Sequence, residues 1–180
     1  MSIPSPPAPS TKNSMESKVP DILTSLDANV GSRNFLGRYV GSIKEPDGLM
    51  MLYGAEHPAL VVQIGWGESW SRIQKDRTLW FEGSNGGVKI LILIHLSNEA
   101  DQIKGDLELM SFDKGVALTQ RKVIWPIPDH KEDPFILLGD IYNNQLPPEC
   151  DPTTRLSLEM SALRVIALQD LDTMLLTNGS

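Results

Sequence analysis

The sequence predicts one α/β domain with a mixed sheet, and three consecutive segments carry that prediction. Residues 60–64 are almost all β-branched or aliphatic, residues 68–81 place apolar side chains at helical spacing, and residues 88–96 form a second apolar run. A strand, a helix and a strand in this order form a crossover, which sets the strands parallel and puts the helix on one face of the sheet. A chain of 180 residues is long enough to build such a domain around its own core.

The segments before the crossover are expected to be a tail, a short helix and a strand. Residues 1–18 are rich in proline and small polar residues, which predicts a disordered tail and leaves residues 19–180 as a single domain. A short helix with apolar residues at helical spacing is expected from Pro20. Residues 49–53 read as a strand that follows a turn at 46–48.

The segments after the crossover are expected to add short strands and a helix. Residues 107–110, 116–118 and 122–125 predict a meander of short strands that extends or flanks the sheet. A further strand is expected near 136–138, and the apolar residues over 156–163 predict a strand that runs into a short C-terminal helix. The sheet is therefore expected to carry extra strands on its C-terminal side.

The charge of the chain is acidic overall and unevenly distributed. The net charge is −7, which argues mildly against a protein that binds polyanions over its whole surface. Residues 126–180 hold nine acidic and three basic side chains, whereas residues 30–90 hold six acidic and seven basic ones. Any contact with nucleic acid is therefore expected in the first half of the chain, at Arg72, Lys75, Arg77 and Lys89.

Cysteine usage and hydropathy predict an intracellular protein, cytoplasmic or nuclear, with no membrane partner. Cys150 is the single cysteine, so no disulfide can form within the chain, and its place after two prolines indicates a loop. No apolar run reaches the roughly 18–20 residues that cross a bilayer. The first residues also lack the basic and then apolar pattern of a signal peptide.

The first strand of the crossover follows a turn carboxylate, Asp47, and carries Gln63 and Gly65 at alternate positions. Alternate residues of a strand lie on one face, so these positions can converge on one site. Mg²⁺ prefers octahedral coordination by hard oxygens, and a lysine beside such a site can orient the attacking water. Gln63 offers a carbonyl oxygen without a negative charge, and Gly65 offers no side chain.

The order of these segments resembles a group of uncharacterised fungal proteins that is similar in layout to the restriction-endonuclease-like, or PD-(D/E)XK, superfamily of nucleases. The similarity covers residues 40–170 and is strongest over 46–96. It implies an αβββαβ core with a mixed sheet. The segments that carry it are Pro46-Asp47, residues 61–65, Glu68-Ser69 with Lys75-Asp76 and Leu79-Trp80, and residues 87–96.

The resemblance implies a role for each candidate residue. Asp47 matches the metal-binding aspartate of the family, Gln63 stands in the place of its second acidic ligand, and Gly65 in the place of its lysine. Lys75, on the following helix, is the candidate substitute for that lysine. Asp47 and Gln63 would then hold Mg²⁺ or Mn²⁺, and Asp47, Gln63 and Lys75 would form the catalytic set. The additional glutamate of the family has Glu16 and Asp27 as its candidates.

Each candidate also has a purely structural interpretation. Asp47 in a Pro-Asp-Gly turn can bond to its own turn, and this interpretation is at least as strong as metal binding. Gln63 can satisfy a neighbouring polar group, and Lys75 can lie on a solvated helix face.

Three functions therefore stay open for the chain. The first is a catalytically weak or inactive domain with a degenerate metal site, which expects Asp47 to make only turn hydrogen bonds and apolar groups to fill the space beside Gly65. The second is an active Mg²⁺- or Mn²⁺-dependent nuclease, which expects Asp47, Gln63 and Lys75 to converge around an open cavity. The third is a protein-interaction module that uses the acidic C-terminal half, which expects an exposed apolar patch.

Overall fold

The computed structural model describes residues 34–52, 54–100, 102–113, 116–129, 132–142 and 146–178. The predicted tail, the short helix expected from Pro20, and the candidates Glu16 and Asp27 lie outside these residues. The described elements are, in chain order, η1 (Gly37–Tyr39), β1 (Gly48–Met50), β2 (Leu60–Trp66), α1 (Trp70–Gly83), β3 (Ile90–Glu99), β4 (Gln102–Asp113), β5 (Val116–Trp125), β6 (Phe135–Leu137), α2 (Leu138–Tyr142), β7 (Arg155–Ser157) and α3 (Met160–Asn178).

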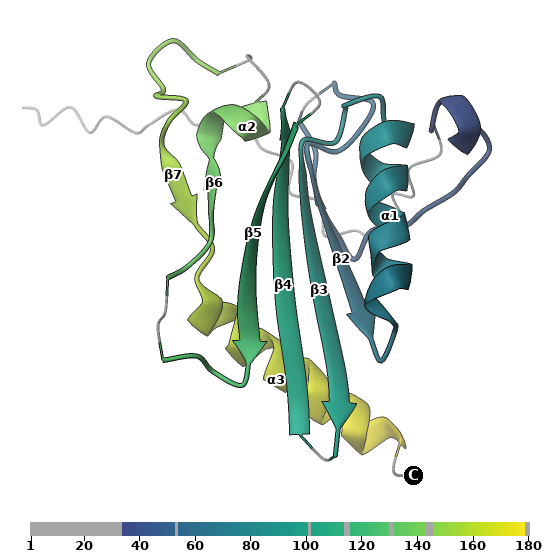
Figure 1. Cartoon of the computed structure of the whole chain (residues 1–180). Helices are drawn as coiled ribbons and strands as arrows, with labels where there is room; N and C mark the ends of the chain where they lie inside the picture. Colours follow the sequence, from purple (N-terminus) through teal and green to yellow (C-terminus); the bar gives the residue numbers. More distant parts are fainter. Residues whose placement is uncertain are drawn as a thin grey trace, which may run out of the picture.

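The centre of the molecule is a mixed sheet of five strands in the order β1-β2-β3-β4-β5 (Figure 1). Strands β2 and β3 are parallel, with Gln63 opposite Leu93, and the other neighbours in the sheet are antiparallel. The predicted α/β class and the parallel pair of the crossover are therefore confirmed.

Helix α1 connects the two parallel strands and covers one face of the sheet. Gly67 has a φ of +65°, a conformation that favours glycine, and it lies between the end of β2 and the start of α1. On its inner side α1 buries Ile73 and Trp80, which pack against Val61, Leu91 and other inward residues of β2, β3 and β4. This apolar layer fixes the direction in which the helix crosses the sheet.

The opposite face of the sheet is covered by elements from the C-terminal third. Ile92, Ile94 and Leu109 of the sheet pack with Ile141 of α2 and Met160 at the start of α3. Figure 1 shows α3 passing behind the strands, on the side away from α1. Strands β6 and β7 pair with each other as a separate two-stranded sheet.

The strands that follow the crossover are longer than predicted. The short strands expected at 107–110, 116–118 and 122–125 are parts of two long strands, β4 and β5, which pair along almost their whole length. Polar and charged residues on the solvated parts of these strands interrupt the apolar runs, so their ends could not be read from hydropathy. Their pairing also shifts register between Gly105 and Asp106.

The element order differs from αβββαβ in the part of the chain that the structure describes. Two strands, β1 and β2, precede α1 there, and β3, β4 and β5 follow it. Among the described helices, none is both long enough and apolar enough to cross a lipid bilayer. Cys150 lies in a turn, where its amide donates a hydrogen bond to the carbonyl oxygen of Pro147, as its sequence context predicted.

Candidate functional site

Asp47 lies directly before β1 and faces β2. Its amide donates to the carbonyl oxygen of Val62 at 3.0 Å, which continues the antiparallel pairing of β1 with β2. Its carboxylate oxygen Oδ2 accepts hydrogen bonds from Nε2 of Gln63 and from the amide of Ile64, both at 2.7 Å. The carboxylate therefore reaches across to the neighbouring strand, and the expected bond within the Pro-Asp-Gly turn is replaced by this contact.

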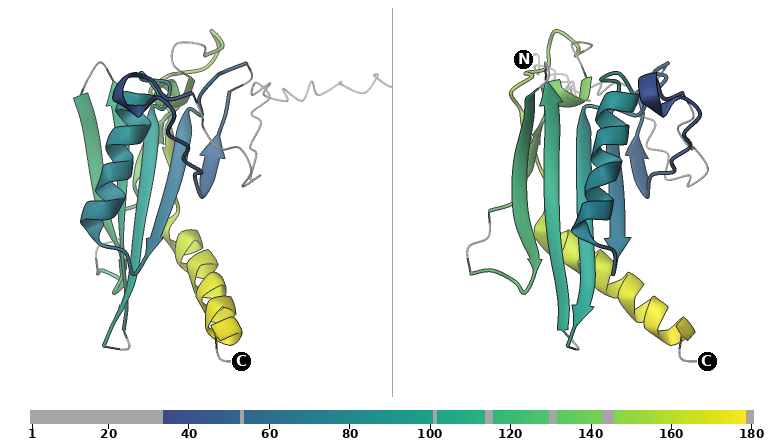
Figure 2. Two further views of the ribbon diagram at one scale, coloured as in Figure 1. Left: turned by 90° about the vertical axis from the view of Figure 1, so that its right-hand side faces the viewer. Right: turned by 45° about the vertical axis from the view of Figure 1, so that its right-hand side comes forward.

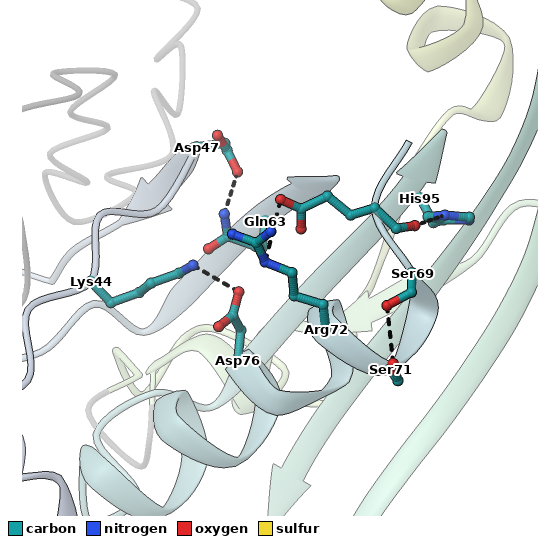
Figure 3. A network of polar contacts seen from close by, with 9 residues as sticks. Lys44, Asp47, Gln63, Ser69, Ser71, Arg72, Asp76 and His95 are labelled. Atoms are coloured by element: carbon teal, nitrogen blue, oxygen red, sulfur yellow. Dashed lines mark hydrogen bonds and ion pairs between the residues drawn. The ribbon is translucent and has the colours of Figure 1, made fainter. Parts of the chain in front are cut away.

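Gln63 is the residue that the family resemblance places beside Asp47 as a second metal ligand. Its side chain lies on the α1 side of the sheet and is buried, with 9% of its surface exposed. Nε2 donates to Asp47, whereas Oε1 is buried without a hydrogen-bond partner among the described residues. The structure thus brings two of the three predicted catalytic residues together, joined by an amide-to-carboxylate hydrogen bond (Figure 3).

The space beside Gly65 is filled by an apolar side chain. A Cβ atom added to Gly65 would lie 2.9 Å from Cγ1 of Ile73, and Ile73 is almost completely buried. A lysine in the place of Gly65 would therefore collide with the inner side of α1. The degenerate-site interpretation expected this apolar filling. It also expected only turn hydrogen bonds for Asp47, and the contacts of Asp47 with Gln63 and Ile64 contradict that part.

Lys75 does not join the other two candidates. Its side chain is exposed on α1, and no hydrogen bond or ion pair of the described residues links it to Asp47 or Gln63. The described contacts therefore do not bring Lys75 to Asp47 and Gln63, and its role at the site stays a prediction. Position 75 lies on the outer side of α1 because the inner side is set by Ile73 and Trp80.

Lys44 is the lysine that the structure places next to this region, and the sequence analysis missed it. Its Nζ lies 2.7 Å from Oδ2 of Asp76, and both side chains are about three-quarters buried, with 28% and 23% of their surfaces exposed. Figure 3 shows this ion pair beside the pair of Asp47 and Gln63. The signal for it was the position of Lys44, three residues before Asp47 in the sequence.

The start of α1 is held by contacts of Glu68. The ring nitrogen Nε2 of His95 lies 2.7 Å from the carbonyl oxygen of Glu68, and Nε of Arg72 lies 3.6 Å from its Oε1 (Figure 3). The ring of His95 also stacks on Trp70, with 5.2 Å between centroids. His95 therefore anchors the helix, which explains why a histidine stands near the end of this strand.

A second polar contact on the same face was not predicted. Glu108 of β4 is buried with 1% of its surface exposed, and it accepts hydrogen bonds from Nε of Arg121 at 2.6 Å and from Nε2 of Gln74. In the sheet register Leu93 separates Glu108 from Gln63. The signal was one charged residue inside the apolar run 107–110.

The four basic residues expected to contact nucleic acid do not form one group. Arg72, Lys75 and Arg77 are exposed along α1, whereas Lys89 precedes β3 and its Nζ lies near Gly86, past the other end of the helix. Since α1 spans 14 residues and a helix rises about 1.5 Å per residue, Lys89 is separated from Arg72 by roughly the length of the helix.

The donors around Asp47 are few for a divalent cation. Among the described residues, no three His, Cys, Asp or Glu side chains group closely enough to hold a metal ion. The contact itself offers the Asp47 carboxylate and the unpartnered Oε1 of Gln63, and the neighbouring carboxylate of Asp76 is paired with Lys44.

Comparison of the chain with protein-family models, with curated proteins and with solved structures finds no match. Inference about function therefore starts from the geometry at Asp47 and Gln63.

Proposed function

We propose that this chain is a restriction-endonuclease-like domain with a degenerate metal site, catalytically weak or inactive, that acts as a binding or scaffold domain. The observation that carries the proposal is the 2.7 Å hydrogen bond from Nε2 of Gln63 to Oδ2 of Asp47. In an intact two-carboxylate site, the space between these side chains is where a cation would neutralise both. Here the amide N–H of Gln63 stabilises the negative charge of the single carboxylate, Asp47, without a metal.

The hydrogen bond opposes metal binding for two reasons. A cation at this place has to displace the amide N–H from Asp47, and a hydrogen bond to a charged group contributes about 1.5–3 kcal/mol. The amide also leaves the site with one fewer negative charge, and Mg²⁺ binds hard anionic oxygens in strict octahedral geometry. Both effects lower the affinity for Mg²⁺.

Among the residues that the structure describes, the site also lacks a lysine that is free to orient an attacking water molecule. Ile73 occupies the space beside Gly65, Lys75 points away on the outer side of α1, and Lys44 is paired with Asp76. A lysine that is paired with a carboxylate is less available to orient a water molecule toward phosphate. These features together favour a scaffold over an enzyme.

One observation favours an active Mg²⁺- or Mn²⁺-dependent nuclease as the second candidate. Oε1 of Gln63 is a buried oxygen without a partner among the described residues, and buried acceptors normally have one. In that case Asp47 would anchor the cation, Gln63 would supply an amide oxygen, and Lys44 would take the place expected for Lys75.

A cleavage assay with Mn²⁺ separates the two candidates, because carboxylate and carbonyl oxygens are ligands that suit this metal. The purified chain is incubated with single- and double-stranded DNA and RNA, beside Asp47→Ala. Glu82→Ala serves as the matched control, because it removes an exposed carboxylate in the last turn of α1 that pairs with Arg38. We expect no cleavage that depends on both Mn²⁺ and Asp47. Cleavage that is lost in Asp47→Ala and kept in Glu82→Ala would overturn the proposal and establish an active enzyme.

A gain-of-binding variant tests the same site without any catalytic readout. Gln63→Glu places two carboxylates where an amide and a carboxylate now bond. We expect Mn²⁺ to raise the midpoint of thermal unfolding of Gln63→Glu and to leave that of the wild-type chain unchanged. An equal rise in both proteins would show that the native site already holds the cation.

A further inference from the structure

In the part of the chain that the structure describes, the face of the sheet opposite Asp47 is only partly covered. Val62, Ile64 and Trp66 alternate along β2 on this face, and Ile64 and Trp66 have 45% and 42% of their surfaces exposed. Leu60, at the other end of the same strand, is buried. Exposed apolar residues on a sheet face indicate a surface that another element can cover.

Helix α3 does not close this gap. Met160 and Leu163 in its first turns pack on the sheet, but the next turn exposes Val165, Ile166 and Leu168, at 56%, 56% and 43%. Both views of Figure 2 show α3 diverging from the strands toward its C-terminal end. A helix with apolar residues on its outer side as well as its inner side is typical of one that is buried on both.

An apolar groove lies between α3 and the sheet. It has a volume of about 230 Å³. Val62, Ile92 and Ile94 of the strands lie on one side, and Leu163 and Ile166 of α3 lie on the other. The exposed side chain of Ile64 continues the strand side of the groove along β2.

The shape of this surface suits a helix. In α/β domains the faces of a sheet are covered by helices packed side by side, with axes about 8–10 Å apart. The exposed part of the sheet face beside α3 is a place where a second helix could pack next to α3. A helix that presents one apolar face would bury Ile64, Ile166 and the groove together.

The charge around the groove favours a basic helix over a second copy of this chain. Among the described residues that line the groove, Glu159 is the charged one, and it is exposed directly before α3. Residues 126–180, which include α3, hold nine acidic and three basic side chains. A second copy of a chain with a net charge of −7 would bring like charges together, whereas a basic helix would meet opposite ones.

We propose that the groove between α3 and the sheet binds a basic amphipathic helix of a partner protein. The apolar face of that helix packs against Ile64 and Ile166, and its basic residues face Glu159 and the acidic C-terminal third. This surface lies on the opposite side of the sheet from Asp47, so the proposal does not depend on the state of the metal site.

The test uses a labelled 18-residue peptide of leucine and lysine with the leucines at helical spacing. Its binding to the whole chain is followed by fluorescence anisotropy. We expect Ile166→Lys and Ile64→Lys each to weaken binding by about tenfold or more, since each removes a buried apolar contact and adds a like charge. Glu159→Lys and added salt should weaken it as well. Leu118→Lys is the matched control, because Leu118 is 67% exposed on β5 and does not line the groove.

Several outcomes would overturn the proposal. The first is no binding of the peptide to the wild-type chain, and the second is an equal loss in Leu118→Lys. Equal binding of a peptide with glutamate in place of lysine would refute the charge argument. A wild-type dimer in sedimentation that Ile166→Lys converts to monomer would assign the surface to a second copy. Urea unfolding of each variant confirms that it is folded.

Discussion

At the scale of single residues, the functional proposal depends on the contact between Asp47 and Gln63. Oδ2 of Asp47 accepts both the side-chain amide of Gln63 and the backbone amide of Ile64. Two donors on one oxygen stabilise a carboxylate without a cation. A glutamate in place of Gln63 would convert this attraction into repulsion between two carboxylates, which is the situation that a bound metal resolves.

The packing of Ile73 against Gly65 leads to a prediction about stability. Gly65→Ala should lower the free energy of unfolding by about 1–3 kcal/mol, because the new methyl group overlaps the side chain of Ile73. The loss should be smaller in an Ile73→Ala background, which a double-mutant cycle by urea denaturation measures. In Gly48→Ala the added Cβ would lie 3.4 Å from Val62, so that control should change little. Additive effects of Gly65→Ala and Ile73→Ala would contradict the prediction.

Asp151 gives a prediction about pH. The hydroxyl of Thr153 and then its backbone amide donate to Oδ1 of Asp151, and they hold the pKa of that carboxyl below its ordinary value of 3.8. A pKa that is lower in the folded state stabilises the fold above pH 3.8, and this contribution is lost as the pH falls through the folded pKa. Thr153→Ala should therefore raise the pKa of Asp151 in a carboxyl NMR titration. An unchanged titration curve would show that the hydroxyl has no effect.

The candidate site was predictable from the sequence only in part. Under the active-nuclease interpretation the family resemblance placed Asp47 and Gln63 together, whereas the degenerate-site interpretation expected only turn hydrogen bonds for Asp47. Lys75 was expected at the site and lies exposed on α1, and Lys44 was missed. Which side of α1 faces the sheet, and how the segment before β1 lies against α1, depend on packing between residues far apart in sequence.

The elements that carry the site are β2, α1 and β3, and their crossover was predicted from hydropathy alone. The long hairpin of β4 and β5 was not, because the polar residues of its solvated face interrupt the apolar pattern. Glu108 lies within that hairpin, where its carboxylate is buried between Gln74 of α1 and Arg121 of β5. This contact ties the helix to strands on the far side of β3.

The buried carboxylate of Glu108 predicts a specific loss of stability. Arg121→Ala should lower the free energy of unfolding by about 1–3 kcal/mol, because it leaves Glu108 buried without its charged partner. The effect should fall short of that of a fully buried ion pair, since the Arg121 side chain is 76% exposed.

Two further variants make this prediction sharp. Glu108→Gln in the Arg121→Ala background should restore part of the stability, because an amide tolerates burial better than an unpaired charge. Lys104→Ala, which removes an exposed ion pair with Glu99, should change the stability by less than about 1 kcal/mol. Equal losses in Lys104→Ala and Arg121→Ala in urea denaturation would count against the buried-charge explanation.

At the scale of the whole molecule, the sheet joins two apolar layers. One layer lies under α1, and the other lies under α2, β6 and the start of α3. Because β2, β3 and β4 contribute residues to both layers, loss of either layer removes support from the same strands. The described part of the chain is therefore expected to unfold in one cooperative step.

Met160→Ala tests this cooperativity. Met160 is 4% exposed at the start of α3, and truncation of a buried methionine costs about 2–5 kcal/mol. Urea transitions followed by far-UV circular dichroism and by tryptophan fluorescence should shift together to lower urea. Val165→Ala, at an exposed position of the same helix, should shift them much less. Separate transitions by the two probes would show that the layers unfold independently.

The sequence by itself determined the α/β class and the parallel crossover. These features follow from the periodicity of short segments and from the handedness of their connection, which are local properties. Only the tertiary structure decided that Ile73 fills the space beside Gly65, that Lys75 is exposed on α1, and that Ile166 lines an open groove. Each of these depends on which residues of distant segments meet, and that is set by the packing of α1 and α3 on the two faces of the sheet.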